Sequence, residues 1–216
     1  MTDASSASNC SLPFVPYYDS DGITIYNADC RKVLPWLERC DLLLTDPPYG
    51  YGWNTNYSRF SRGTNDKRAI ENDKTPVSLD PWIQITTEQM IFGCNSLPQQ
   101  RPGSYLIWDK RCADGFAFLS DGEAAWWSEG HGVYLCSINA QQHRSKAGLH
   151  PTQKPVQLMS WCISKAKVAD SILDPFMGSG TTLVAAKLEG RKAIGIELDE
   201  KYCEIAVERL RQGVLF

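Results

Sequence analysis

One short segment limits the fold of this chain more than any other. Residues 171–186 read SILDPFMGSGTTLVAA: a short apolar run, an aspartate, a Gly-x-Gly turn and a stretch with helical character. A strand that turns tightly into a helix is the repeating unit of α/β proteins, where the strand is buried on both faces. The segment therefore predicts an α/β fold with a parallel sheet.

The rest of the chain alternates strand-like and helix-like patterns in the same way. Strands are predicted from short β-branched or aromatic apolar runs at residues 23–27, 42–45, 105–108, 124–127, 133–138, 172–173 and 193–196. Helices are predicted at residues 31–39, 80–93, 156–167, 181–189 and 200–212. Several strands are too continuously apolar for a half-exposed sheet, which indicates a doubly wound, mostly parallel sheet.

Length and composition favour one soluble domain. The chain has 216 residues, 43% of them hydrophobic and 22% charged, and no apolar run approaches the ~18 residues of a membrane span. We predict a flexible tail at residues 1–20, a single domain at 21–216 and a mobile loop at about 51–75. The Ser-rich start lacks signal-peptide features, so a cytoplasmic location is expected.

Eight cysteines raise the question of a metal or disulfide framework. They are scattered without any C-x-x-C pair. Structural zinc needs closely spaced thiolates and disulfides need an oxidising compartment, so we expect reduced thiols and no metal.

The net charge of −3 taken alone argues against binding of nucleic acid, but the charges are unevenly distributed along the chain. Residues 130–169 contain no Asp or Glu but hold several cations and all three histidines. A second basic stretch is interleaved with Tyr57 and Phe60. The candidate phosphate-contacting residues are Arg59, Arg62, Lys67, Arg68, Arg144 and Lys146. The alternative is that these clusters are ordinary solvated faces.

The glycine turn and the next strand together suggest a nucleotide-type cofactor site. Gly178 and Gly180 would let a ligand approach the backbone, and the following helix offers unpaired N–H groups. Leu183 occupies the third-glycine position of a dinucleotide fingerprint, which disfavours a nicotinamide enzyme. Glu197 lies at the ~20-residue spacing at which an acid binds ribose hydroxyls. The alternative is a tight turn and an exposed acid.

The segment DPPY at residues 46–49 directly follows the apolar run 42–45. Asp46 should therefore lie at the carboxyl end of a strand, where such sheets bind ligands. Pro47 and Pro48 fix the backbone so that its carbonyls point in a set direction. The Asp46 carboxylate and a carbonyl of the proline turn are two oxygen acceptors beside the Tyr49 ring. They would suit an exocyclic amino group on a planar base. A structural Pro-Pro turn with a surface tyrosine is the alternative.

These motifs, in this order, resemble the amino-methyltransferases of DNA. DPPY at 46–49, DPFMGSG at 174–180 and GIELD at 195–199 are similar to that family, as are HPTQKPVQLM at 150–159, ADCR at 28–31 and the middle stretches FGCN, LIWDK and DGEAAW. Because DPPY precedes the glycine turn, the chain resembles the circularly permuted beta class, in its small phage-type form. The likeness spans about residues 22–212 and implies a seven-stranded, Rossmann-like methyltransferase sheet.

The resemblance implies a function and a set of site residues. It implies methyl transfer from S-adenosylmethionine to adenine N6 in DNA, by direct in-line transfer to a flipped base. The catalytic residues would be Asp46, Pro47, Pro48 and Tyr49. The cofactor-binding residues would be Asp29, Cys30, Thr152, Lys154, Asp174, Pro175, Phe176, Gly178, Ser179, Gly180, Thr181, Glu197 and Leu198. The setting would be the cytoplasm of a bacterium or phage-infected cell, as in restriction-modification systems.

Several alternatives stay open at this level. The same chemistry could act on cytosine N4, although a Ser in place of Asp46 would favour that more. A catalytically idle S-adenosylmethionine or nucleic-acid binding module would be expected to have lost part of DPPY. A methyltransferase of RNA or glutamine side chains usually has a leading Asn. Only residues 139–149 fill the position of a target-recognition domain, so low sequence selectivity is expected unless a homodimer supplies more surface.

Overall fold

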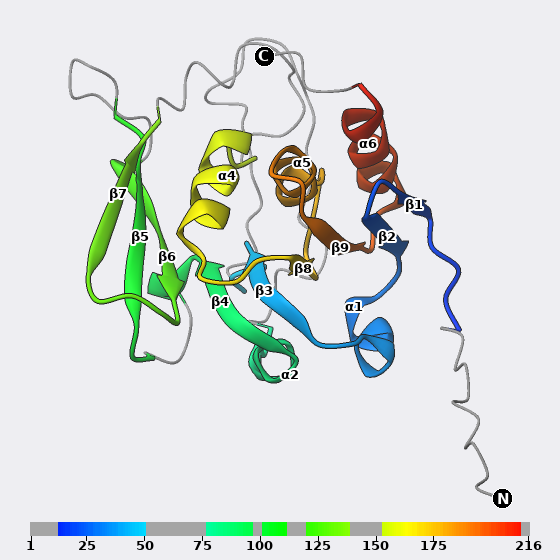
Figure 1. Ribbon diagram of the computed structural model, residues 1–216, viewed down its shortest axis with the longest axis horizontal. Helices are drawn as coiled ribbons and strands as arrows, with labels where there is room; N and C mark the ends of the chain where they lie inside the picture. Colours follow the sequence, from blue (N-terminus) through cyan, green and yellow to red (C-terminus); the bar gives the residue numbers. More distant parts are fainter. Residues whose placement is uncertain (1–12, 51–76, 97–100, 112–119, 139–152, 213–216) are drawn as a thin grey trace, which may run out of the picture.

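The computed structural model describes residues 13–50, 77–96, 101–111, 120–138 and 153–212. Within these ranges the chain forms one nine-stranded sheet of order β1-β2-β9-β8-β3-β4-β6-β5-β7 (Figure 1). The strands are β1 (Tyr18–Ser20), β2 (Ile23–Asn27), β3 (Cys40–Thr45), β4 (Thr86–Phe92), β5 (Ser104–Asp109), β6 (Gly122–Trp127), β7 (Val133–Ser137), β8 (Ser171–Asp174) and β9 (Lys192–Glu197). The five central neighbours from β2 to β4 are mutually parallel, while β1 and β6 run antiparallel to the strands beside them.

Helices cover both faces of this sheet. The helices are α1 (Cys30–Val33), α2 (Asp80–Gln84), α4 (Val156–Lys165), α5 (Thr181–Leu188) and α6 (Glu200–Arg211), with short 3-10 turns η1 (Leu34–Trp36) and η3 (Cys94–Ser96). Figure 1 shows α4, α5 and α6 on one side of the strands and α1 and α2 on the other. The doubly wound arrangement predicted from the sequence is therefore confirmed.

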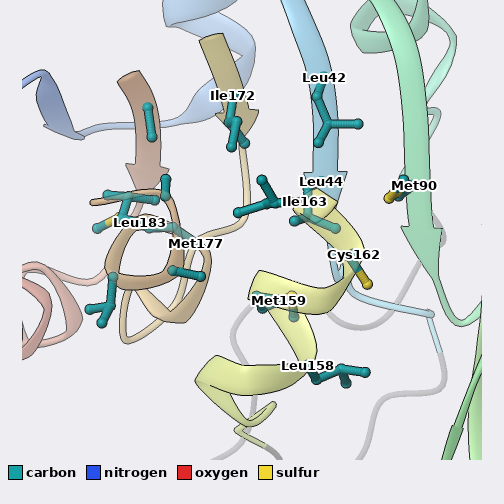
Figure 2. Close-up of a cluster of buried hydrophobic side chains, with 14 of the residues drawn as sticks. Leu42, Leu44, Met90, Leu158, Met159, Cys162, Ile163, Ile172, Met177 and Leu183 are labelled. Carbon is teal, nitrogen blue, oxygen red and sulfur yellow. The ribbon is translucent and has the colours of Figure 1, made fainter. Parts of the chain in front are cut away.

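Two hydrophobic cores follow from the alternation of side chains along each strand. Leu42 and Leu44 of β3 join the core beneath α4, α5 and α6, whereas Leu43 between them joins the core on the α1 and α2 side. In Figure 2 the apolar residues of α4, among them Met159 and Ile163, lie against the strand residues. A strand with both faces buried explains the unbroken apolar run that the sequence displays.

The predicted helix at residues 80–93 is wrong. The segment is a short helix, α2, followed by strand β4, which pairs with both β3 and β6. The pair Thr86–Thr87 and the run Met90–Phe92 favour a buried strand, and periodicity alone does not separate a short buried strand from a helix. The strand β1 also lies inside the stretch expected to be a tail, because it pairs with β2. These two strands raise the count from seven to nine.

The parallel strands β9, β8 and β3 bring their carboxyl ends to one edge of the sheet. The side chain of Thr45, the last residue of β3, donates a hydrogen bond of 2.8 Å to Asp174, the last residue of β8. Because DPPY follows Thr45 and the glycine turn follows Asp174, two motifs 128 positions apart become neighbours. Within the described part of the chain, every helix is too short or too polar to cross a lipid bilayer.

Candidate active site

The DPPY turn places Asp46 beyond the end of β3, with Tyr49 folded back onto it. The Tyr49 hydroxyl donates a hydrogen bond to Oδ1 of Asp46. The tyrosine ring lies so close to Gly93 that a Cβ added there would come within 1.9 Å of it. Gly93 has a φ of +70°, so a glycine is required there for both conformation and space. The ring that we predicted would stack on a base is, in this structure, packed against the protein.

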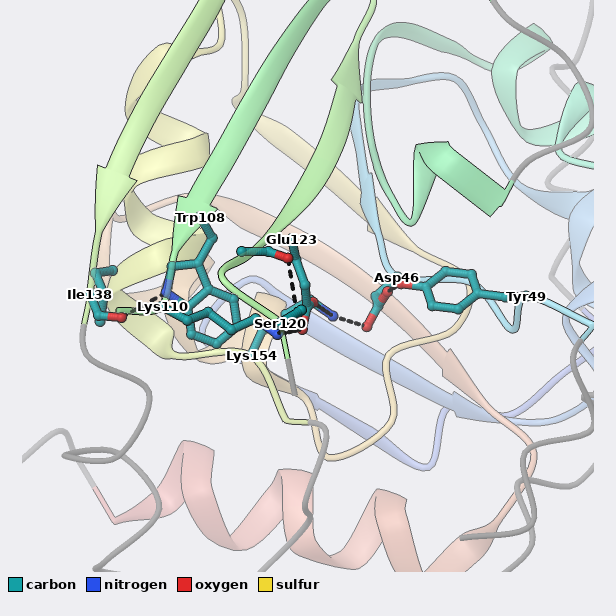
Figure 3. A network of polar contacts seen from close by, with 9 residues as sticks. Asp46, Tyr49, Trp108, Lys110, Ser120, Glu123, Ile138 and Lys154 are labelled. Atoms are coloured by element: carbon teal, nitrogen blue, oxygen red, sulfur yellow. Dashed lines mark hydrogen bonds and ion pairs between the residues drawn. The ribbon is translucent and has the colours of Figure 1, made fainter. Parts of the chain in front are cut away.

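A buried lysine holds the other oxygen of Asp46. The Lys154 ammonium pairs with Oδ2 of Asp46 and, at 2.9 Å, with Oε2 of Glu123 on β6. Figure 3 shows Lys154 between these two carboxylates. Glu123 is held in turn by Lys110 at 2.5 Å, and Lys110 donates to Ser120 at 3.2 Å. The result is a chain of alternating charges that ends at the candidate catalytic carboxylate.

Burial and pairing act in opposite directions on these groups. Burial alone would lower the pKa of Lys154, whose side chain is only 6% exposed, but the carboxylates of Asp46 and Glu123 outweigh it and raise the pKa. Burial alone would raise the pKa of Glu123, and the two lysines lower it instead. The pKa of Tyr49 is raised far above its ordinary value, by burial first and by Asp46 second. Lys154 and Glu123 therefore stay charged and Tyr49 stays neutral at physiological pH.

Asp174, the first residue of the DPFMGSG segment, is buried and accepts several hydrogen bonds. It accepts hydrogen bonds from the Thr45 hydroxyl, from the Phe176 N–H at 3.2 Å and from Thr182. Burial raises its pKa to about 6, in spite of these donors. Its contacts make Asp174 the link between the glycine segment and β3, and its predicted role toward a cofactor stays a prediction.

The two glycines of the turn have different reasons to be glycine. Gly178 has a φ of +51° and open space where a Cβ would be, as expected where a ligand approaches the backbone. Gly180 has a φ of +77°, and a Cβ there would lie 2.6 Å from Cβ of Ala206 on α6. Its absence of a side chain thus serves the close packing of α5 on α6, where we had expected ligand approach.

Glu197, at the end of β9, supports this turn. One carboxylate oxygen accepts the Gly178 N–H at 3.0 Å, and the other accepts the Asp199 N–H at 2.9 Å. Burial raises the pKa of Glu197. The carboxylate therefore fixes the turn and the start of α6 while still having lone pairs for a ligand.

The remaining predicted cofactor residues that the structure describes fall at the same edge of the sheet or next to it. Asp29 caps α1 and is paired with Arg31 at 2.6 Å, which lowers the pKa of Asp29. Leu198, beside Glu197, is 48% exposed. Phe176 packs edge-on against Trp82, with ring centroids 6.4 Å apart. Cys30 begins α1 next to Asp29, and Pro175 is buried beside Asp174.

Some predictions fall outside the described residues. These are the loop at 51–75, Thr152 and all the proposed phosphate contacts: Arg59, Arg62, Lys67, Arg68, Arg144 and Lys146. In the described ranges, no group of three or more potential metal ligands occurs.

Sequence reasoning missed three residues that the structure brings to the site. Glu123 lay within the DGEAAW stretch, but nothing in its spacing distinguished it from a surface acid. Lys110 likewise lay in LIWDK. Arg209 of α6 donates to the Ser179 carbonyl of the glycine turn at 2.6 Å, and its only sequence signal was its place on an amphipathic helix. All three act on residues at least 10 positions away, so local patterns could not identify them.

Comparison with known protein families identifies relatives over most of the chain. A family described as DNA methylase matches residues 107–208. Type II methyltransferase M.HinfI of Haemophilus influenzae is 50% identical over 246 residues, which cover 88% of this chain and 68% of that protein. M.ScaI of Streptomyces caespitosus is 47% identical, with 90% and 83% covered. M2.LlaDCHI of Lactococcus lactis subsp. cremoris is 51% identical over 71 residues, and the match spans 32% of this chain and only 26% of that relative.

Solved structures share the fold at lower identity. The PvuII DNA methyltransferase, described as cytosine-N4-specific, superimposes with a TM-score of 0.60 at 15% identity and covers 92% of this chain and 90% of that one. The complex of M1.HpyAVI with SAM gives a TM-score of 0.57 at 22% identity, with 87% and 98% covered. These likenesses confirm the Rossmann-like α/β fold.

Proposed function

The chain belongs to the N6/N4 DNA methylase family, and on that premise we propose that it transfers a methyl group from S-adenosylmethionine to an exocyclic amino group of DNA. One observation supports this most directly: the Thr45–Asp174 hydrogen bond holds the DPPY turn beside the glycine turn. Because this hydrogen bond holds the two turns side by side, a cofactor bound at the glycine turn would lie next to a base bound at the DPPY turn.

The residues at the glycine turn suit the cofactor. Gly178 leaves open space beside its backbone, and the carboxylate of Glu197 lies against it with lone pairs to spare for ribose hydroxyls. Exposed Leu198 offers an apolar surface for a flat adenine ring. When bound, S-adenosylmethionine supplies an activated methyl group that an amino nitrogen can take up by direct displacement.

Asp46 is the residue that handles the target base in this proposal. A flipped base would present its amino N–H groups to Asp46 and to the Pro47 carbonyl, which orients the nitrogen lone pair toward the methyl group. One oxygen of Asp46 now accepts the Tyr49 hydroxyl. An incoming amino group would replace that donor and release the Tyr49 ring to stack on the base. The other oxygen of Asp46 stays paired with the Lys154 ammonium, which holds the carboxylate in place.

Adenine N6 is the preferred target in this proposal, and cytosine N4 is the second candidate. The leading Asp46 favours adenine. The fold does not distinguish adenine from cytosine as the target, since the PvuII DNA methyltransferase, described as cytosine-N4-specific, shares it.

We also propose weak sequence selectivity. The alignment with M.HinfI is 246 residues long but covers 88% of this 216-residue chain, so that relative has about 56 more residues within the aligned region. Reading one base pair well takes a dedicated side chain worth ~1–3 kcal/mol, and several pairs need a supporting scaffold. A chain with less inserted sequence has fewer positions for such side chains, unless a second copy in a homodimer adds some. The basic residues between 51 and 75, with Arg144 and Lys146, are proposed to contact phosphates.

The test is to incubate mixed genomic DNA with the protein and S-adenosylmethionine and to map every modified base by direct sequencing. We expect N6-methyladenine at a short or degenerate site, and none with Asp46→Ala. Modification confined to cytosine would replace adenine by the second candidate. A fixed site of six or more base pairs would contradict weak selectivity. No modification, with cofactor binding intact, would favour an idle binding module.

A further inference from the structure

Arg209, on the last turn of α6, reaches across to the glycine turn. Its guanidinium donates to the Ser179 carbonyl at 2.6 Å, to the Ser179 hydroxyl at 3.2 Å and to the Thr181 hydroxyl at 3.1 Å. The amide oxygen of Gln153, in the orientation that satisfies both groups, accepts from the same guanidinium at 3.0 and 2.9 Å. One side chain thus ties together the glycine turn, the start of α5 and the segment that carries Lys154.

The charge of Arg209 has no counterpart among the described residues. Every acceptor that it contacts there is neutral, and no carboxylate of the described ranges forms an ion pair with it. Burial lowers its pKa to about 10, with no acid acting against this effect, and the group remains a cation at physiological pH. A half-buried cation surrounded by neutral dipoles is an unbalanced charge that would favour a bound anion.

The direction of these hydrogen bonds adds a second feature. Ser179 and Thr181 are only 8% and 6% exposed, and both hydroxyl oxygens accept from Arg209. A hydroxyl that accepts from a cation keeps its own proton for another acceptor. Within the described part of the chain no acceptor takes the proton of Thr181, which lies at the first turn of α5 with the unpaired N–H groups of the helix.

We propose that Arg209 is a positioning residue for the carboxylate end of the cofactor. It holds Ser179 and Thr181 as hydrogen-bond donors toward that carboxylate, and its unbalanced charge stabilises the carboxylate's negative charge. This inference rests on the proposed function, because it takes S-adenosylmethionine as the ligand of the glycine turn. Lys154, which the resemblance implied as a cofactor-binding residue, is already shared between Asp46 and Glu123. Among the described residues, Arg209 is therefore the cation that contacts the turn.

The experiment pairs a change in the protein with a change in the ligand. Calorimetric titration measures the binding of S-adenosylmethionine and of its decarboxylated analogue to the wild-type protein, to Arg209→Met and to Arg209→Lys. Arg211→Met, an exposed arginine two residues further along the same helix, is the matched control. We expect Arg209→Met to weaken S-adenosylmethionine binding by about 10- to 100-fold and the analogue by about threefold or less. Arg209→Lys should lose less affinity for S-adenosylmethionine, because lysine keeps the positive charge although it lacks the forked donors of arginine.

Each outcome supports or overturns the inference. Equal losses for both ligands would show that Arg209 only braces the turn, and undiminished binding by Arg209→Met would exclude any role in binding. If Arg209→Met fails to fold by thermal unfolding, Arg209→Lys carries the comparison, with a loss for S-adenosylmethionine and none for the analogue. Failure of the wild-type protein to bind S-adenosylmethionine would instead overturn the proposed function and this inference with it.

Discussion

The two halves of the site are built on different physical principles. At the end of β3, Asp46 is held by charges: Lys154, Glu123 and Lys110 alternate in sign. At the ends of β8 and β9, the glycine turn is held by backbone N–H groups and neutral hydroxyls, together with Arg209, a cation with which no carboxylate of the described residues forms an ion pair.

The glycine turn depends on local sequence, whereas the charged network around Asp46 depends on the tertiary structure. The glycine turn uses backbone groups of consecutive residues, which any chain with that spacing can present. The members of the charged half directly follow β3 and β5, lie in β6 or precede α4, and only the sheet brings them together. Substitutions should therefore separate the two halves, with chemistry affected at one and cofactor binding at the other.

The largest separation is expected from Asp46→Ala. Removing an aimed acceptor should lower the rate of methyl transfer by about 10³-fold, while the affinity for S-adenosylmethionine stays unchanged because Asp46 lies on the other turn. Single-turnover kinetics and calorimetry measure the two quantities. Asp170→Ala, which removes an exposed acid before β8, is the control and should leave both unchanged. Near-normal turnover would contradict the role of Asp46.

Lys154→Met tests the charged half through stability. It leaves Asp46 and Glu123 without their shared cation, and we expect a loss of about 3 kcal/mol in the free energy of unfolding. Adding Glu123→Gln should recover part of this, since one uncompensated carboxylate is removed. Urea unfolding gives both values. The control is Lys187→Met, which breaks the surface pair with Asp21 and should cost less than about 1 kcal/mol. Equal losses in the two lysine variants would refute a special role for Lys154.

Asp174, which links the two halves, should make stability depend on pH. Its pKa of about 6 in the folded protein is above the ordinary value of 3.8, so the folded state retains a proton that the unfolded chain has released. The stability that this proton contributes is present below about pH 4 and lost as the pH rises through 6, by roughly 2 to 3 kcal/mol. Asp174→Asn should lack this loss. Urea unfolding of both proteins between pH 4 and pH 7 compares them, and parallel profiles would show that Asp174 does not titrate in this way.

The smallest expected effect concerns Glu197→Ala. It removes the acceptor for the Gly178 and Asp199 N–H groups and for the proposed ribose contact, so S-adenosylmethionine should bind about tenfold more weakly. The maximal rate of methyl transfer at saturating cofactor should change little. Calorimetry and steady-state kinetics separate the two, with the exposed Glu189→Ala as the control. A fall in maximal rate with unchanged affinity would place Glu197 in the other half of the site.

Much of the sheet was predictable because its strands carry local signals. β3, β8 and β9 are short apolar runs that end in an acid or at the DPPY turn, and their positions agree with the prediction. The strand β4 was not predictable, because its apolar residues also fit a helix. Only its pairing with β3 and β6 decides between strand and helix. Gly180 shows the same limit, since its close neighbour Ala206 belongs to another helix.

The sequence by itself determined the α/β class and the placing of Asp46 and of the glycine turn at strand ends, because each depends on residues close together in the chain. It also determined the family, because the motifs and their order can be read along the chain. Only the tertiary structure decided that Lys154 joins Asp46 to Glu123, that Tyr49 turns its hydroxyl to Asp46, and that Arg209 braces the glycine turn. These contacts depend on distance and on the balance of charge in a partly buried space. Both are properties of how the strands and helices pack, and no spacing along the chain encodes them.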